Sequence, residues 1–597
     1  MNRKGIKMFI EKINCPEDLK ELSIEQCVQL AGEIRSAIIK KASLVGGHLA
    51  SNLGTVELTI ALHYVFDSPK DKIIFDVSHQ CYSHKILTGR KDAYLDEEKY
   101  NSVTGYTTPS ESEHDYFRVG HTATSVSLAC GLAKARDLKG DKENVIAVIG
   151  DGSLSGGEAF EGLNFGGAEL KSNLIIVFND NQMSIAENHG GVYKSFAELR
   201  ATKGKAENNF FKTLGYDYYF VKDGHDIASI VDALNAVKGI NHPVVVHVCT
   251  VKGKGYEYAQ THKEKTHYVR PFEVSTGMEK SSFNGERYDR IIRDHLLKKM
   301  KEDKKIVTMI AAVPDSLNFT KEYREQAGEQ FIDVGIAEEH AISMTAGLAK
   351  NGCKPVFATL ATFYQRTYDQ ISQELCINKA PATLIVANAS VYAANDVTHI
   401  GIFDIPMMAN IPNLIYLAPT NKQEYLAMLD WSIEQQEHPV AIRAPRNGVF
   451  YAKGEVDADY GNLNKYKTEI VGEKIAVLAL GDFYQLGEEV VEKIAGDLEI
   501  KATLINPRYI TGIDEELLSG LMKDHQIVIT LEDGILDGGW GQKIAGFYGT
   551  TVMKVLNYGL KKDFLDRYNV DKVMTKSRLK SNLIVSDIKE LLNHEQL

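Results

Sequence analysis

One carboxylate stands among glycines in the stretch GDGSLSGG, residues 150–157, which follows an apolar, strand-like run that starts at Val145. A carboxylate that faces a bound phosphate repels it unless a cation lies between the two charges. Mg²⁺ prefers oxygen ligands and commonly bridges carboxylates and phosphate groups. The position of Asp151 therefore predicts a magnesium ligand that anchors a diphosphate.

A second ligand is expected from a neighbouring strand end, because parallel α/β sheets bind ligands outside the carboxyl ends of their strands. Asn181 follows the apolar run 174–178 and comes thirty residues after Asp151. Its side-chain oxygen and the backbone carbonyl of Met183 would complete the protein's share of the metal ligands. Taken singly, Asp151 fits a helix cap and Asn181 fits a turn, so the prediction depends on the pair.

Two other phosphate-binding patterns do not fit this stretch. Its glycine spacing differs from the dinucleotide fingerprint GxGxxG, which argues against an α/β dehydrogenase. The glycines are not followed by Lys-Ser or Lys-Thr, which excludes a P-loop.

The elements that must position these residues are short apolar runs separated by helix-length segments. This alternation predicts an α/β fold whose mainly parallel sheets are covered by helices on both faces. Polar, turn-rich stretches at 253–287 and 451–468 are interpreted as linkers. They divide the chain into three α/β domains, at 1–275, 283–455 and 465–597. The strand-like runs are 144–150, 173–180, 243–250, 305–313, 382–389, 413–419, 439–445, 474–481, 502–508 and 526–533.

Composition excludes several classes of protein. The net charge of −12 and the lack of a long basic block argue against a nucleic-acid-binding protein. Seven cysteines without any CxxC pair predict neither a zinc site nor a disulfide framework, and they fit a reducing compartment. No apolar run approaches the ~20 residues of a membrane helix, and the N-terminal residues lack the apolar core of a signal peptide. We expect a cytoplasmic protein with no membrane and no nucleic-acid partner.

The pair formed by GDG and Asn181 resembles the motif that binds thiamine diphosphate. Three longer stretches indicate which family of thiamine-diphosphate enzymes the chain resembles, at 46–92, 110–140 and 333–352. Through them, nearly the whole chain resembles the 1-deoxy-D-xylulose-5-phosphate synthase family of transketolase-like enzymes. The resemblance implies a decarboxylative condensation of pyruvate with D-glyceraldehyde 3-phosphate that depends on thiamine diphosphate and Mg²⁺. It also implies a homodimer, with a diphosphate-binding domain, a pyrimidine-binding domain and a C-terminal transketolase-like domain in that order.

Site residues follow from the matched motifs. The resemblance makes Glu338, in GIAEEH, the acid beside the pyrimidine ring of the cofactor, and it makes Phe363 the ring that stacks on that pyrimidine. Without the family, Glu338 fits the exposed face of a helix and Phe363 fits a core position. The other implied cofactor-binding residues are Gly150, Asp151, Gly152, Ser153, His79, His121 and Asn181, and the implied catalytic histidines are His48, His79, His267 and His399.

The acceptor side departs from the family pattern. The family typically reads Asp-Arg-Ala-Gly and then Gly-Ala-Asp-Gly-x-Thr-His, whereas this chain has Asn388 for the arginine and Asn395 for the aspartate. A tyrosine that is usual nearby is Leu360 here. An asparagine cannot replace the charge with which arginine grips a phosphate. The candidate substrate residues are therefore Arg366, Arg446, His399 and Asn395.

A second departure follows Asn181, where the family carries a mobile segment that is longer by a few tens of residues. Shortening it would remove part of a flexible cover over the site. Three interpretations stay open: a shortened synthase, a paralogue with another aldehyde or sugar-phosphate acceptor, and a non-catalytic regulatory protein on the same fold. Asp151, Asn181 and Glu338 argue against the third.

Overall fold

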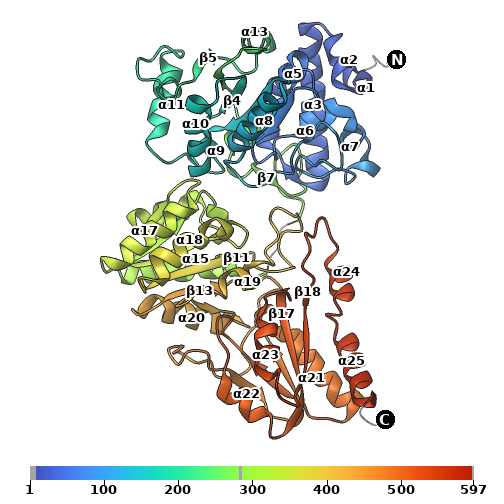
Figure 1. The fold of residues 1–597 in the computed structure, drawn as a ribbon, viewed down its shortest axis with the longest axis vertical. Coiled ribbons are helices and arrows are strands. Elements are labelled where there is room, and N and C mark those ends of the chain that lie inside the picture. Colours follow the sequence, from blue (N-terminus) through green and yellow to red (C-terminus); the bar gives the residue numbers. More distant parts are fainter. Residues whose placement is uncertain (1–7, 282–284, 595–597) are drawn as a thin grey trace. The chain divides into compact units, whose positions relative to one another are not determined.

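The structure, a computed structural model, describes residues 8–281 and 285–594. The chain forms two compact units, one of residues 1–284 with 335–337 and the other of residues 285–334 with 338–597. Figure 1 colours the first unit from blue to green and the second from green to red.

The first unit is built on a five-stranded parallel sheet of order β2-β3-β4-β6-β5. Alternate residues of β3 enter two separate cores: Ile146 and Val148 pack with helices α3, α5 and α13, and Ala147 and Ile149 pack with α8 and α10. Burial on both faces explains why these strands are continuously apolar rather than alternating. The bounds are β2 Lys72–Phe75, β3 Val145–Gly150, β4 Leu174–Asp180, β5 Asp217–Val221, β6 Pro243–Cys249, α3 Ile24–Val45, α5 Val56–Val65, α8 Ser125–Lys139, α10 Gly157–Glu169 and α13 Ile227–Val237.

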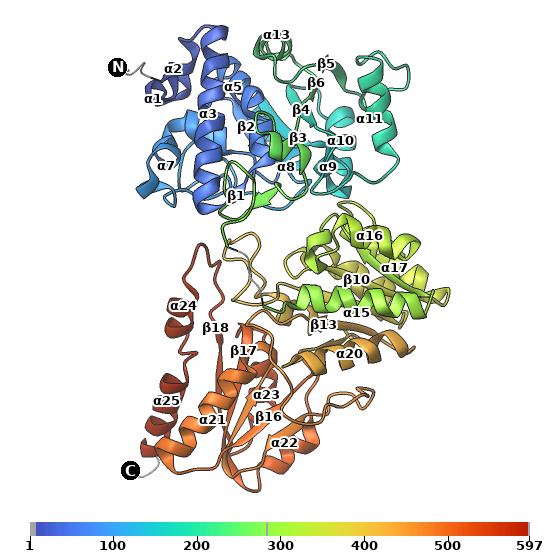
Figure 2. The same cartoon turned by 180° about the vertical axis from the view of Figure 1, so that it is seen from behind.

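The second unit contains two sheets that share one apolar core (Figure 2). Their orders are β12-β13-β11-β10-β8-β9 and β14-β16-β15-β17-β18. Leu384 of the first sheet and Leu478 of the second belong to the same buried cluster, together with Trp540. The bounds are β8 Ile306–Ile310, β9 Phe331–Asp333, β10 Lys354–Leu360, β11 Ala382–Ala387, β12 Ile415–Leu417, β13 Pro439–Arg443, β14 Lys467–Ile470, β15 Lys474–Ala479, β16 Thr503–Asn506, β17 His525–Ile535 and β18 Lys554–Leu560.

The predicted α/β class with mainly parallel sheets is confirmed, and each of the ten predicted runs contains a strand. Strands β2, β5, β9, β10, β14 and β18 lie outside those runs, as do the two short strands described in the next paragraph. Several of them are short or contain polar residues, so their apolar signal is weak.

The interpretation of residues 253–287 as a linker is wrong in part. This stretch contains helix α14 (Glu257–Thr261) and strand β7 (Tyr268–Val269). Strand β7 pairs antiparallel with β1 (Gly47–His48), so that His48 lies opposite Tyr268. The partner strand is more than two hundred residues away, and a local composition pattern cannot reveal such a pairing.

Among the described residues, no helix is long and apolar enough to cross a membrane.

Candidate active site

The two predicted metal ligands lie at the carboxyl ends of neighbouring strands. Strand β3 ends at Gly150, and Asp151 begins the short helix α9 (Asp151–Leu154). Strand β4 ends at Asp180, directly before Asn181. The two strands are adjacent, with Gly150 opposite Asn179. Parallel sheets bind ligands at this edge.

Asp151 is 1% exposed, and its two carboxylate oxygens have different surroundings. Oδ2 accepts a hydrogen bond of 2.6 Å from Nδ2 of Asn188, while the backbone carbonyl of Asp151 accepts one of 3.1 Å from the Tyr193 hydroxyl. Oδ1 is buried and has no hydrogen-bond partner among the described residues. Burial raises the pKa of Asp151 to about 7, and the charge of Asp180 adds to the rise. A buried carboxylate oxygen without a donor is costly, and a cation would satisfy it.

The loop after β4 packs closely against the start of α9. The side-chain oxygen of Asn181 accepts a hydrogen bond of 3.2 Å from the backbone N–H of Met183. A Cβ atom at residue 152 would lie 3.0 Å from both side-chain atoms of Ser184, which accounts for Gly152. The site thus offers a carboxylate, an amide oxygen and backbone carbonyls, which are the ligand types that Mg²⁺ prefers. These residues fit a magnesium ion.

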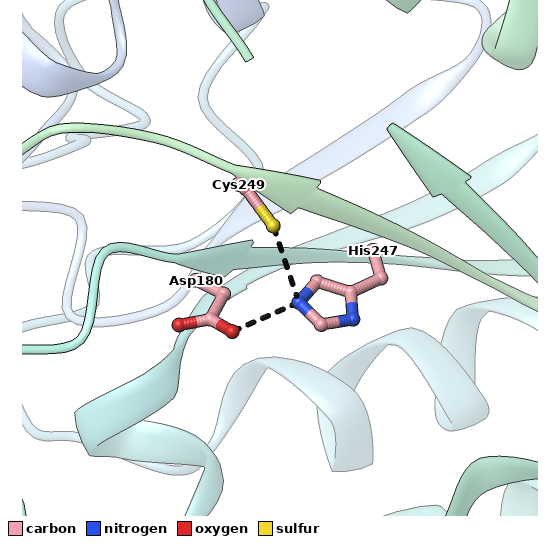
Figure 3. Close-up of side chains that lie close together, drawn as sticks. All are labelled: Asp180, His247 and Cys249. Carbon is pink, nitrogen blue, oxygen red and sulfur yellow. Dashed lines mark hydrogen bonds and ion pairs between the residues drawn. The ribbon is translucent and has the colours of Figure 1, made fainter. Parts of the chain in front are cut away.

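A buried network of three side chains lies at the carboxyl ends of the adjacent strands β4 and β6 (Figure 3). His247 Nε2 lies 2.9 Å from Asp180 Oδ2 and 3.9 Å from the sulfur of Cys249. Asp180, His247 and Cys249 are residue types that bind metals, and they are close enough together to do so. Burial raises the pKa of Cys249 to about 12, so its thiol is protonated in this structure.

Two further side chains bond this network, although Oδ1 of Asp180 is buried without a hydrogen-bond partner among the described residues. The guanidinium of Arg200, from helix α11 (Val192–Ala201), forms an ion pair with Oδ2 of Asp180. The hydroxyl of Tyr218 lies 2.6 Å from His247 Nδ1. With the carboxylate neutralised, the network holds the end of β4 rather than a metal ion. Sequence reasoning missed Arg200 and His247, although a histidine inside the apolar run PVVVHVCT is a detectable signal.

Three of the predicted catalytic histidines come together in the first unit. The ring centroids of His48, His79 and His267 lie 4.9 to 5.4 Å apart. The pairing of β1 with β7 places His48 next to the strand that follows His267. Burial and the charge of Lys252 hold the pKa of His267 well below its ordinary value, so its imidazole is neutral. Its Nδ1 atom is buried without a hydrogen-bond partner among the described residues.

Asp76 is a positioning residue that the sequence analysis missed. It follows β2, and its two carboxylate oxygens accept hydrogen bonds of 2.9 Å from the backbone N–H groups of Ala123 and Ser125. It therefore fixes the turn that leads from His121 into α8. A carboxylate directly after an apolar strand was the same signal that singled out Asp151.

The second unit contains Glu338, the first residue of helix α17 (Glu338–Lys350). Its side chain is buried, and Oε2 has no hydrogen-bond partner among the described residues. Burial raises the pKa of Glu338 to about 7, and the positive charge of Arg366 opposes the rise. The alternative that Glu338 faces water is therefore wrong.

Phe363 and His399 also lie close together. The Phe363 ring meets His399 edge-on, with 5.7 Å between the centroids. His399 Nδ1 lies 2.8 Å from the Thr398 hydroxyl, which also bonds a side-chain oxygen of Asp396 at 2.5 Å. The segment that carries His399 is thus shaped by a turn at Asp396.

The remaining predicted substrate residues are Arg366, Arg446 and Asn395, and the positive charge of Arg366 acts on Glu338. Arg446 and Asn395 are exposed. The backbone N–H of Arg446 donates to Asp482 at 2.8 Å. Three residues earlier, Arg443 is buried and bonds both carboxylate oxygens of Asp404, at 2.8 and 3.1 Å. Of the two arginines in this stretch, Arg443 is therefore structural and Arg446 is accessible.

Comparison with known families defines the class. Residues 287–450 match the pyrimidine-binding domain of transketolase, and residues 465–566 match the transketolase C-terminal domain. Together with the parallel sheets, these matches define a transketolase-like enzyme. Residues 10–208 and 198–250 match the 1-deoxy-D-xylulose-5-phosphate synthase model.

Full-length relatives agree with that model. The chain is 39% identical to the 1-deoxy-D-xylulose-5-phosphate synthase of Alkaliphilus oremlandii (strain OhILAs), over 98% of this chain and 99% of the relative. It is 38% identical to the enzyme of the same name from Caldanaerobacter subterraneus subsp. tengcongensis, over 97% and 98%. The chain belongs to the 1-deoxy-D-xylulose-5-phosphate synthase family. It is therefore a transketolase-like transferase of a thiamine-diphosphate-dependent family.

Proposed function

We propose that this chain condenses pyruvate with D-glyceraldehyde 3-phosphate, releasing CO2 and forming 1-deoxy-D-xylulose 5-phosphate. Family membership over nearly the full length supports the reaction. The observation that carries the cofactor site is the buried Oδ1 atom of Asp151, which has no partner among the described residues and lies beside the strand end that presents Asn181.

The first domain, about residues 1–275, is proposed to hold the diphosphate end of the cofactor. Thiamine diphosphate, when bound, supplies the nucleophilic carbon and the electron sink that decarboxylation requires. Asp151, Asn181 and the carbonyl of Met183 would hold Mg²⁺, consistent with their oxygen ligands. The backbone of the stretch after β3 and two histidines would contact the cofactor itself: Gly150, Gly152, Ser153, His79 and His121.

The second domain, about residues 283–455, is proposed to hold the pyrimidine ring of the cofactor. The pKa of the Glu338 carboxyl is raised to about 7, so this group keeps a proton near neutral pH. The protonated carboxyl can donate a hydrogen bond to a ring nitrogen. Phe363 is proposed to stack on the ring, since flat rings pack favourably.

The imidazoles are proposed to handle protons of the substrate. Because His267 is neutral, its Nδ1 atom can accept or donate one hydrogen bond to a reacting group. His48 and His79 lie within the same cluster, and buried hydrogen-bond donors there would stabilise developing negative charge. His399, supported by the Asp396 turn, is proposed to act on the acceptor side with Asn395.

Arg366 and Arg446 are proposed to bind the phosphate or carboxylate of the substrates, because guanidinium groups pair bidentately with such anions. They would compensate for Asn388, where the family carries arginine. The shortened segment after Asn181 is consistent with the alignment to the Alkaliphilus relative. That alignment spans 634 positions, more than the 597 residues of this chain.

We further propose a cytoplasmic homodimer. In support of the dimer, Phe165 on α10 is 48% exposed and lies one helical turn from the exposed Glu161. Single exposed apolar side chains are common on surfaces, but aromatic residues are enriched at interfaces, so Phe165 is the position at which the proposal is tested. Seven cysteines without CxxC pairs fit a reducing compartment. The third domain, about residues 465–597, is proposed to support the dimer.

One assay tests the reaction. Purified protein is given thiamine diphosphate, Mg²⁺ and pyruvate, and D-glyceraldehyde 3-phosphate is compared with other aldehydes and sugar phosphates. We expect 1-deoxy-D-xylulose 5-phosphate and an equal amount of CO2 with the first aldehyde only. CO2 release that needs a different acceptor would overturn the proposed substrate, and failure to bind the cofactor would overturn the whole proposal.

A further inference from the structure

The acceptor segment, residues 388–399, has little structure of its own. It leaves β11 at Ala387 and contains neither helix nor strand before α19 (Asp404–Met408). Backbone hydrogen bonds between residues of the segment are short-range, such as that from the His399 N–H to the Asp396 carbonyl at 3.0 Å. A loop of this kind takes its shape from the contacts it makes with its surroundings.

Residues far along the chain bind the backbone of the acceptor segment. The Tyr568 hydroxyl lies 2.8 Å from the carbonyl oxygen of Val391 and 3.4 Å from that of Ala394. The backbone N–H of Arg567 donates to the carbonyl of Asn395 at 2.6 Å. Tyr568 and Arg567 belong to the loop between β18 and α24 (Val570–Lys576). Strand β18 is part of the last sheet of the chain (Figure 2).

Two carboxylates bind the N–H groups of the same segment. Oδ1 of Asp533 accepts from Val391 at 3.0 Å, and Oδ1 of Asp566 accepts from Val397 at 3.4 Å. Asp533 is 1% exposed, and its backbone carbonyl accepts a hydrogen bond from Arg443. The rigid end of β17 therefore fixes one end of the segment, while the β18–α24 loop binds its middle.

We propose that Asp533, Asp566, Arg567 and Tyr568, here named the C-terminal clamp, position the acceptor segment and thereby set the affinity of the enzyme for its aldehyde substrate. The clamp residues are positioning residues that act through Asn395 and His399. This assignment gives the third domain a part in substrate recognition beyond support of a dimer. It rests on the proposed function, because that function places Asn395 and His399 at the acceptor.

The geometry implies that the clamp affects the affinity for the aldehyde and not that for pyruvate. Clamp bonds reach Val391, Ala394, Asn395 and Val397, all on the chain just before His399. Directly before His399, the Thr398 carbonyl accepts a hydrogen bond of 3.1 Å from the Thr362 hydroxyl, which is not part of the clamp. Loosening the clamp should therefore displace Asn395 and tilt His399, and leave the first unit unchanged.

The test compares Tyr568→Phe with Tyr558→Phe. The first removes the hydroxyl that binds Val391 and Ala394 but keeps the ring. The second removes a hydroxyl from the same domain that donates to Asp587 at 2.9 Å and does not touch the segment. Two readouts are needed: hydrogen exchange of the amides in residues 391–399, and the KM of each substrate in the full-length holoenzyme.

We expect Tyr568→Phe to speed exchange of these amides by about fivefold to tenfold, as for the loss of one hydrogen bond. The KM for the aldehyde should rise by about the same factor, with the KM for pyruvate and the melting temperature nearly unchanged. Tyr558→Phe should change neither readout. Asp566→Ala should behave like Tyr568→Phe, whereas Asp566→Asn, which keeps an acceptor oxygen, should restore wild-type values.

Unchanged exchange in both Tyr568→Phe and Asp566→Ala would show that the clamp does not restrain the segment. Faster exchange with an unchanged aldehyde KM would show that the segment does not set acceptor affinity. Either result overturns the inference. The proposed function fails differently, through an absence of product in the wild-type enzyme.

Discussion

Buried carboxylates that look alike in the sequence differ in what their oxygens bind. Both oxygens of Asp76 accept backbone N–H groups, so this residue is part of the scaffold. Asp151 follows its strand in the same way, but only Oδ2 is bonded, to Asn188. A carboxylate with one oriented and one unsatisfied oxygen is suited to bind a cation. The partners, rather than the residue type, separate a structural acid from a ligand.

Asn188 should therefore matter to metal binding although it is not among the predicted ligands. Outer partners that orient a ligand typically contribute about 10- to 100-fold to metal affinity. We expect Asn188→Ala to weaken Mn²⁺ binding at least about tenfold, measured by electron paramagnetic resonance in the presence of thiamine diphosphate. Asn241→Ala, at an exposed position in the same unit, is the control. Equal Mn²⁺ affinity of Asn188→Ala and wild type would contradict the orienting role.

Glu338 gives a prediction about pH. Its pKa is raised to about 7 in the folded protein, above its usual 4.5, so the folded state binds a proton that the unfolded state has lost. Stability contributed by this group is thus present below about pH 4.5 and decreases as the pH rises towards 7. Glutamine does not ionise, so the Glu338→Gln variant does not lose this stability as the pH rises. The variant should gain up to about 3 kcal/mol relative to wild type between pH 5 and 8.

Unfolding can be followed by tryptophan fluorescence, because Trp431 and Trp540 both lie in the second unit with Glu338. A stability difference that does not change with pH would refute the assignment.

The same position tests the chemistry: Glu338→Ala should abolish turnover and leave binding of the magnesium–diphosphate group largely intact. Wild-type turnover in that variant would show that Glu338 is not catalytic.

At the scale of elements, helix α11 joins the end of β4 to the loop around Asp151. Arg200 from this helix pairs with Asp180, and Tyr193 from its first turn bonds the carbonyl of Asp151. The helix begins soon after Asn181, so it connects the end of β4 to the loop around Asp151.

Removing the Arg200 guanidinium should weaken the attachment of helix α11 to the end of β4. Asp180 is fully buried, and a buried charge that loses its partner costs about 3 kcal/mol. We expect Arg200→Ala to accelerate hydrogen exchange in α11 and at the end of β4 by about 100-fold. The double variant Arg200→Ala with Asp180→Asn should recover part of that protection, and Lys194→Ala on the same helix should have no effect. Wild-type protection in Arg200→Ala would mean that the ion pair does not hold the helix.

Sequence patterns predicted elements whose signal is local and missed those whose signal is not. The apolar runs at β3, β4 and β6 are buried on both faces, which made them recognisable. The placement of Asp151 and Asn181 at neighbouring strand ends was predictable because each follows such a run. The cluster of His48 and His267 depended on a two-residue strand pair, and the clamp depended on contacts across about 170 residues. Neither has a local pattern, so only the fold reveals them.

At the scale of the whole molecule, the proposed homodimer can be tested at the surface of α10 that carries Phe165. We expect the protein to sediment at twice its mass of 66.3 kDa. Phe165→Asp should shift the population towards the monomer, since a buried charge at an interface opposes association. Val552→Asp, at a position that is 99% exposed in the other unit, should leave the dimer intact. A monomeric wild type, or a dimer unaffected by Phe165→Asp, would contradict this interface.

The pairing of β1 with β7 also determines when the histidine cluster can form during synthesis. His48 and His79 emerge early from the ribosome, but His267 and its neighbour Tyr268 follow almost two hundred residues later. Because contacts distant in sequence form late, the sheet of the first unit can assemble before its imidazoles meet. A nascent chain that stops before residue 267 would carry Asp151 and Asn181 on a folded sheet yet lack the third imidazole. The order of translation thus places the sheet edge that carries Asp151 and Asn181 before the cluster of three histidines.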